Sequence, residues 1–494
     1  WADADGDGAK CGERCEERVI DGGVGGVSAG WVGAVRGAHE VELRDGDGSA
    51  GGDWVGRGAV VGGRCECHGR QRESGRVLGG DSSFAEMTSA SARFFPQGFG
   101  ILLMLNLVNY ADRSVLSAVL PMVREAYFSG REDAGLKLGL LQTAFLVSYM
   151  VTAPVFGRLA RGYSPWRLMG VGAVVWSLCT VWTGLASDYA MLVMARVGVG
   201  VGEAAFGPLA PALIAGGVDA ERRGRVMSFF YLAIPVGSAL GYAIGGVLGS
   251  AFGWREAFWV MGFPGLLLGV RCWVSGGAAG GTGRGEVLGS RGISLVRNRL
   301  FLMNTLAMTA VTFALGGLSV WMPTFLMEKS AEAGAGVGLE RVNLVFGAMM
   351  VFGGIGATVM GGWAADRVRR VRANGLYAVA GWATVLAGPA VGLAVWASWG
   401  WQWVALALAV FLVFVHSGPA NAALAESVPE AERPTAFAWN IFIIHALGDA
   451  ISPALIGGVA DRWGLQTGMG VVGCAVLAGG VIWLAAGRRG AVSR

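Results

Sequence analysis

The chain has 494 residues, of which 53% are hydrophobic and only 15% are charged, and it carries 19 tryptophans. Its mean hydropathy of +0.52 and its long apolar stretches are typical of an integral membrane protein. The formal net charge of +4 does not indicate nucleic acid as a partner, because such binding depends on a strong positive field.

Residues 1–94 are Gly-rich, with scattered Asp, Glu and Arg and no helix or strand period, so we expect a disordered tail. The chain opens with Trp1 and its first methionine is Met87, so an over-extended gene model is an alternative explanation for this segment. The run from Asp3 to Gly8 imitates the start of an EF-hand loop, but Arg14 stands where a bidentate Glu is needed.

Four cysteines of the tail and one of its two histidines are candidate zinc ligands: Cys11, Cys15, Cys65, Cys67 and His68. Their spacing is irregular and does not match a structural zinc site. We therefore expect no metal site and no cofactor.

Between residue 95 and the C-terminus, twelve apolar segments have roughly the 20-residue length that crosses a ~30 Å hydrocarbon core. They begin near residues 98, 138, 165, 189, 224, 254, 300, 342, 374, 401, 435 and 467. The sequence predicts an all-α membrane protein with twelve transmembrane helices in two six-helix bundles.

Arginines gather in the even-numbered connections between these segments, for example Arg158, Arg222, Arg297 and Arg369. The positive-inside rule then places the even connections and both termini in the cytosol. The first connection is an exception that also contains basic residues: Arg124, Arg131 and Lys137.

A Gly-rich connection divides the spans into two sets of six. We expect an N-terminal bundle over 95–274, a cytosolic linker over 275–297, a C-terminal bundle over 298–488 and a cytosolic tail over 489–494. The second-to-third connections of the two halves, 157–163 and 361–367, resemble each other, which indicates an internal repeat about a pseudo-two-fold axis.

Four charged residues of the first half lie well away from the ends of its spans: Asp112, Arg113, Arg196 and Glu203. A charge at the centre of a spanning helix costs roughly 2.5–3.5 kcal/mol, so such residues indicate a functional site. Asp112 and Arg113 are adjacent, so they point about 100° apart and cannot both face one point. Arg196 and Glu203 are two helical turns apart on one face of the fourth span.

The second half offers weaker candidates. His445 and Asp449 lie one turn apart in the eleventh span, where they form either a proton-responsive pair or a packing pair. Tyr242, Trp321 and Trp439 are candidates for lining an amphipathic cavity, the alternative being ordinary core or interface aromatics.

Five runs carry a resemblance to a known family. They cover residues 109–113, 195–204, 230–242, 416–422 and 440–453. Together with the 6+6 pattern and the Gly-x-x-x-Asp-Arg connection at 362–367, they resemble the major facilitator superfamily, and in particular its spinster branch, over roughly residues 97–487.

The resemblance implies a secondary transporter that moves a lysolipid or sphingoid-type lipid by alternating access, coupled to protons. It also implies a monomer in the plasma membrane or an endolysosomal membrane. On this basis Asp112 and Glu203 are proton carriers, and Arg113 and Arg196 are their partners or ligands for the lipid headgroup. A structural ion network is the alternative.

The resemblance further implies that Gly362, Asp366 and Arg367 form a cytosolic gating loop. The first half departs from this pattern, since Arg161 and Gly162 stand where the family has Asp and Arg. The missing Asp puts the gating role of the first-half loop in question.

Three other functions compete. A carrier of the same superfamily for an organic anion, sugar or drug fits the same pattern, and so does a non-transporting receptor or scaffold, although the latter leaves the paired charges unexplained. The four histidines are scattered along the chain and give no catalytic constellation, so the sequence does not indicate an enzyme.

Overall fold

The computed structural model describes residues 81–131, 133–218, 220–275, 295, 297–372 and 374–492. Side chains are described within these ranges from residue 98 onward, except at 220–224, 431 and 489–492. These residues belong to one compact unit, Leu78–Arg494. The expected metal-like motifs, most of the expected tail and most of the linker over 275–297 lie outside the described residues.

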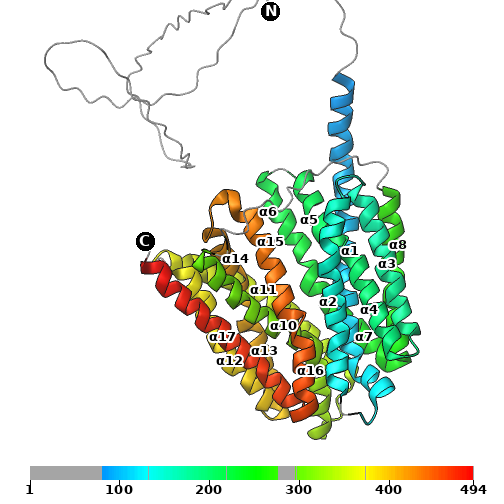
Figure 1. Cartoon of the computed structure of the whole chain (residues 1–494), viewed down its shortest axis with the longest axis vertical. Coiled ribbons are helices and arrows are strands. Elements are labelled where there is room, and N and C mark those ends of the chain that lie inside the picture. The colour runs from blue at the N-terminus through cyan, green and yellow to red at the C-terminus, as the bar shows by residue number, and fades with distance from the viewer. Residues whose placement is uncertain are drawn as a thin grey trace, which may run out of the picture. The chain divides into compact units, whose positions relative to one another are not determined.

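The described chain folds into helices, drawn in chain order in Figure 1. The first half contains α1 (Asp81–Phe128), α2 (Ala134–Leu159), α3 (Pro165–Leu185), α4 (Tyr189–Glu203), α5 (Phe206–Gly217), α6 (Ala220–Tyr231), α7 (Ala233–Phe252) and α8 (Trp254–Ser275). The second half contains α10 (Arg299–Glu332), α11 (Leu339–Arg369), α12 (Gly375–Trp396), α13 (Trp399–Phe414), α14 (Ser417–Glu426), η1 (Glu430–Glu432), α15 (Arg433–Ile444), η2 (His445–Asp449), α16 (Ser452–Trp463) and α17 (Leu465–Val492).

These helices make twelve spans. Eleven segments in the described part of the chain are long and apolar enough to cross a membrane, and α1 precedes them. The second to twelfth spans begin within four residues of the predicted positions. The first does not, because α1 begins at Asp81, so the expected boundary at residue 95 falls inside this helix. Residues 84–92 include three Ala, one Glu and one Met, which have high helix propensity and favour extension of the helix.

Four spans are interrupted: the fourth (α4 and α5), the fifth (α6 and α7), the tenth (α13 and α14) and the eleventh (α15, η2 and α16). Each helix that follows an interruption has a proline among its first three residues: Pro208, Pro235, Pro419 and Pro453. Proline has no N–H to donate to the carbonyl four residues earlier, so it favours a break in the helix at these places.

The two halves repeat the same helix neighbours. In the first half α3 packs on α8, α1 on α7, and α2 on α4. In the second half the corresponding spans do the same, since α12 packs on α17, α10 on α15 and η2, and α11 on α13. This repetition confirms two six-helix bundles related by a pseudo-two-fold axis.

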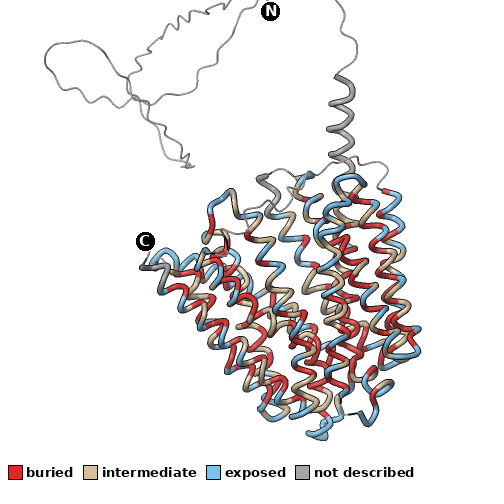
Figure 2. Tube along the Cα trace, in the orientation of Figure 1, coloured by how far each residue is buried: buried red, intermediate tan, exposed pale blue. Residues whose placement is uncertain are grey.

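Buried residues follow the inner faces of both bundles (Figure 2). Many large apolar side chains are nevertheless exposed, among them Phe352, Val359 and Trp401. An exposed apolar surface of this kind is unfavourable in water but matches the hydrocarbon core of a membrane.

The bundles meet through three helix pairs: α2 with α16, α7 with α11, and α1 with α10. Glycines permit the closest approach, since a Cβ added to Gly135 would lie 2.5 Å from the carbonyl oxygen of Gly457. Near the middle of this contact, Thr143 Oγ1 of α2 donates to the Ala450 carbonyl at 2.6 Å.

Polar contacts between the bundles gather toward the odd-numbered connections. The Asp461 carboxylate at the end of α16 accepts from the amides of Gly135, at 2.7 Å, and Leu136, at 2.8 Å, in the first turn of α2. Arg124 at the end of α1 pairs with Glu328 of α10 at 2.7 Å. The bundles are therefore joined on this side of the molecule.

The basic residues of the first connection are engaged with acids. Besides the Arg124–Glu328 pair, Lys137 and Arg131 both lie beside Asp133. The hydrogen bond from Lys137 lowers the pKa of Asp133 below its usual value. All three basic residues of the first connection therefore take part in ion pairs on this side of the molecule.

Candidate functional site

Asp112 and Arg113 of α1 point toward different helices. The Asp112 carboxylate is 1% exposed, and its Oδ2 accepts from Thr180 Oγ1 of α3 at 2.6 Å. Arg113 donates from Nε to Oε2 of Glu203 on α4 at 2.7 Å, and its side chain is 19% exposed. Two adjacent charges thus have separate partners, and Arg113 is the more accessible of the two.

The two charges of α4 are also separated. Glu203 is fully buried and pairs with Arg113 of α1. Arg196 is 1% exposed and donates from a terminal nitrogen to Gln142 Oε1 of α2 at 3.3 Å. The four predicted residues therefore form one cluster inside the N-terminal bundle, held by α1, α2, α3 and α4.

Aromatic rings surround the two guanidinium groups. The Arg113 guanidinium carbon lies 4.9 Å from the ring centre of Tyr110 and 5.2 Å from those of Phe145 and Tyr149. The Arg196 guanidinium carbon lies 4.8 Å from the ring centre of Phe145. These distances fall within the range of favourable cation–π interaction, which is strongest where water is excluded.

The cluster is not fully satisfied by hydrogen bonds. Oδ1 of Asp112 and Nε of Arg196 are buried without a hydrogen-bond partner among the described protein atoms. Buried polar atoms of this kind are costly, and in a functional site they mark places where a proton, water or ligand group would be stabilised.

His445 and Asp449 are in contact, with His445 Nδ1 2.9 Å from Asp449 Oδ2. Both lie in η2, a single π-helical turn of a kind frequently found at functional sites. Gly316 of α10 allows this turn to approach closely, because a Cβ added there would lie 2.5 Å from that of Asp449. A role of the pair in coupling stays a prediction.

The aromatic candidates divide into two groups. Tyr242 and Trp321 are each 1% exposed. The Tyr242 hydroxyl donates to the Ser319 carbonyl at 2.6 Å, and Trp321 Nε1 donates to the Pro453 carbonyl at 2.9 Å. In this conformation both side chains pack between helices, and a role of either in lining a cavity stays a prediction. Trp439 is 37% exposed and packs edge-on against Phe442.

The expected gating loop lies at the end of α11. Asp366 and Arg367 are exposed. Gly362 lies close to Gly418 of α14, since a Cβ added to Gly418 would lie 3.5 Å from the Cα of Gly362. The ion pair that joins α11 to α14 at this end is formed by Arg369 and Glu426, with Arg369 donating at 2.6 Å. Arg161 and Gly162 of the first half are likewise exposed, in a turn closed by the Gly162 amide and the Leu159 carbonyl.

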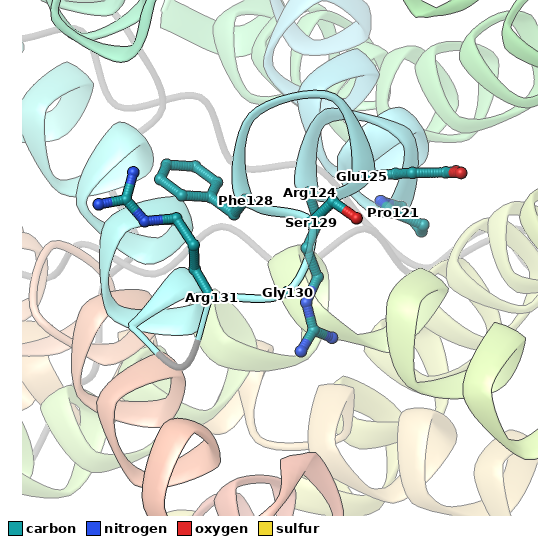
Figure 3. A pocket seen from close by; sticks show the side chains of 7 residues that line it. All are labelled: Pro121, Arg124, Glu125, Phe128, Ser129, Gly130 and Arg131. Carbon is teal, nitrogen blue, oxygen red and sulfur yellow. The ribbon is translucent and has the colours of Figure 1, made fainter.

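A pocket at the end of α1 lies apart from this cluster. Figure 3 shows the side chains that line it, from Pro121 to Arg131. Its Arg124 and Arg131 are the residues that pair with Glu328 and Asp133. The pocket thus belongs to the first connection.

The sequence did not single out Thr180, Gln142, Phe145 and Tyr149, which complete the cluster. The spacing of three of these residues does mark a shared helix face. Gln142, Phe145 and Tyr149 are spaced by three and four residues, so they share one face of an otherwise apolar helix. No such signal marks Thr180, because a single Thr in a span commonly bonds its own backbone.

Two six-helix bundles with charges buried in the first define a carrier of the major facilitator type. A model of the Major Facilitator Superfamily matches residues 102–373, which is more than half of the chain. The fold is also that of solved structures. A bacterial homologue of the human lysosomal transporter Spinster, in an inward-facing and occupied conformation, superposes with a TM-score of 0.67 at 19% identity, covering 79% of this chain and 96% of that one.

Sequence relatives narrow the family. Protein spinster homolog 1 of Xenopus laevis is 33% identical over 393 residues, covering 73% of this chain and 72% of that protein. The probable sphingolipid transporter spinster homolog 2 of Arabidopsis thaliana is 29% identical over 431 residues, covering 80% of this chain and 87% of that protein. The chain belongs to the spinster family of major facilitator transporters.

Proposed function

We propose that this transporter moves an amphipathic lipid with an anionic headgroup, of the lysolipid or sphingoid type, by proton-coupled alternating access. The arrangement of Arg113 carries the proposal. It is the one member of the buried cluster with a partly exposed side chain, and it is held by both an acid and aromatic rings. The name of the Arabidopsis relative, a probable sphingolipid transporter, supports this substrate class.

The pair of Arg113 and Glu203 gives a physical route to coupling. Charged Glu203 occupies the Nε side of the guanidinium group. When Glu203 takes up a proton it loses its negative charge, and Arg113 becomes available to an anionic headgroup. Proton and lipid then favour the same state of the carrier, which is the requirement for coupling.

Asp112 is the second proton carrier in this mechanism. Its Oδ1 atom is buried without a partner, and its Oδ2 atom is held by Thr180. A protonated Asp112 could donate from the free oxygen, whereas the ionised form needs a nearby cation such as Arg196.

We further infer that the even-numbered connections and both termini face the cytosol, as the arginine distribution favours. With the bundles joined on the opposite side through Asp461 and Arg124, the state described is closed to the outside. His445 and Asp449 would act as a secondary coupling pair, Trp439 would line the substrate path, and Gly362, Asp366 and Arg367 would act in the opposing closure.

The test is the Asp112→Asn variant in proteoliposomes. Asn keeps the shape and the acceptor for Thr180 but cannot take up a proton. We expect lysolipid flux to lose its dependence on a pH gradient, whereas Glu430→Gln, at an exposed position of η1, should retain it. Unchanged coupling in Asp112→Asn would refute the role of Asp112 as a proton carrier.

A substrate panel separates the competing functions. The wild-type protein should transport lysolipid in preference to soluble organic anions, sugars and drugs. Preference for a soluble compound would indicate another major facilitator carrier, and binding without any flux would indicate a receptor.

A further inference from the structure

The ring of Phe145 of α2 lies against both arginines of the cluster. Its ring centre lies 5.2 Å from the Arg113 guanidinium carbon and 4.8 Å from that of Arg196. The residue is fully buried, with 0% of its surface exposed. A single ring is thus shared by two cations inside an apolar helix bundle.

The electrostatics of this arrangement need an explanation. Two guanidinium groups repel each other, and the repulsion is larger in a medium of low dielectric constant than in water. The face of an aromatic ring carries partial negative charge and attracts both cations. Arg113 also has the Glu203 carboxylate, whereas the hydrogen bond from Arg196 goes to the neutral amide of Gln142. The ring therefore acts together with the nearby Asp112 and Glu203 carboxylates in placing Arg196.

We propose that Phe145 is a positioning residue for the charge cluster. Its ring holds Arg113 and Arg196 at separate places, so that Glu203 pairs with Arg113 on another helix and not with Arg196 on its own helix. This inference deepens the proposed function and rests on it, because a correctly placed Arg113 is the ligand for the anionic headgroup.

The position of Phe145 on α2 also connects the cluster to the contact between the bundles. Two residues earlier, Thr143 donates to the Ala450 carbonyl of the opposite bundle at 2.6 Å. Gln142 and Tyr149 flank Phe145 on its own face of the helix, where Gln142 accepts from Arg196 and the Tyr149 ring lies against Arg113. A movement of α2 relative to α16 therefore also moves the ring that places both cations.

Fluorinated phenylalanines at position 145 test the proposal, because each added fluorine weakens the negative ring face while the shape changes little. In proteoliposomes that contain an anionic lysolipid, the half-saturating concentration should rise stepwise with fluorine number, by about tenfold for the pentafluoro ring. Phe145→Trp should retain tight binding, because Trp has the strongest cation-binding face. The same series at Phe206, whose ring packs on Trp176 and Phe230, is the matched control and should be flat.

A flat response at position 145, or equal responses at 145 and 206, would overturn the proposal, since either result means that Phe145 serves packing alone. The thermal unfolding midpoint, measured on the same samples, should fall stepwise at 145 and not at 206, and it requires no transport. If the wild-type protein carries no lysolipid, the proposed function fails, and the unfolding series still decides whether the ring holds the two arginines.

Discussion

The two bundles share a backbone plan but differ in the chemistry of their internal polar residues. The N-terminal bundle contains two acids and two bases on α1 and α4, all buried except the partly exposed Arg113. Near the beginning of α10 and the end of α17, the C-terminal bundle has a network in which Trp483 Nε1 donates to Asn304 Oδ1 at 2.7 Å and the His416 ring lies 5.2 Å from that of Trp483. The internal repeat has thus preserved helix packing and not the polar residues inside it.

This difference indicates a division of labour. A buried charge responds strongly to a proton or an anionic ligand, because the surrounding dielectric does little to screen it. A neutral network with satisfied hydrogen bonds, such as Asn304 donating to the Ala420 carbonyl at 3.1 Å, gives a stable structure with little response to charge. We therefore expect the N-terminal bundle to contain the coupling chemistry and the C-terminal bundle to serve mainly as the partner against which it moves.

The largest expected effect comes from Arg113→Leu. The substitution leaves Glu203 buried without its cation, so we expect the free energy of unfolding to fall by about 3–5 kcal/mol. Arg369→Leu in the C-terminal bundle is the control, because it breaks a partly exposed ion pair worth about 0–1 kcal/mol. Denaturant unfolding in detergent measures both. Equal losses of unfolding free energy in the two variants would mean that the ion pairs of the two bundles contribute equally to stability.

An intermediate effect is expected at the contact between the bundles. Asp461→Ala removes the acceptor for two amides of α2, which should shift the equilibrium toward separation on this side by about 1–3 kcal/mol. Spin labels on Ser187→Cys and Ser398→Cys, in exposed connections of the two bundles, would report a larger population at long distance. Glu430→Ala, at an exposed position of η1, should leave the distance distribution unchanged. An unchanged distribution in Asp461→Ala as well would show that these bonds do not hold the closed state.

The smallest effect is expected in the C-terminal bundle, from His445→Gln. The pair with Asp449 is partly exposed, so its loss should lower the free energy of unfolding by less than about 1 kcal/mol. The half-saturating substrate concentration should rise by less than about fivefold. Flux at several pH values, compared with Asp112→Asn, gives the measurement. A loss of coupling as large as that of Asp112→Asn would contradict the proposed division between the bundles.

Much of the fold follows from local sequence properties. Segment length and hydropathy are enough to place the spans, and the 100° between neighbouring residues correctly implies separate partners for Asp112 and Arg113. The pairing of Arg113 with Glu203 does not follow, because it joins residues 90 positions apart and depends on how α1 and α4 are rotated in the bundle. Phe145 was missed for a related reason, since a Phe in an apolar span is normally a packing residue.

The interrupted spans have a consequence for how the carrier changes conformation. The fourth, fifth, tenth and eleventh spans are each divided into shorter helices. The helices on the side of the even-numbered connections can therefore tilt while the helices on the other side, such as α16 with its Asp461 contact, stay in place. Opening and closing then require local bending at four points, and no complete bundle must slide through the lipid. Amide hydrogen exchange should therefore be faster around Pro208, Pro235, Pro419 and Pro453 than in the unbroken α3 and α12.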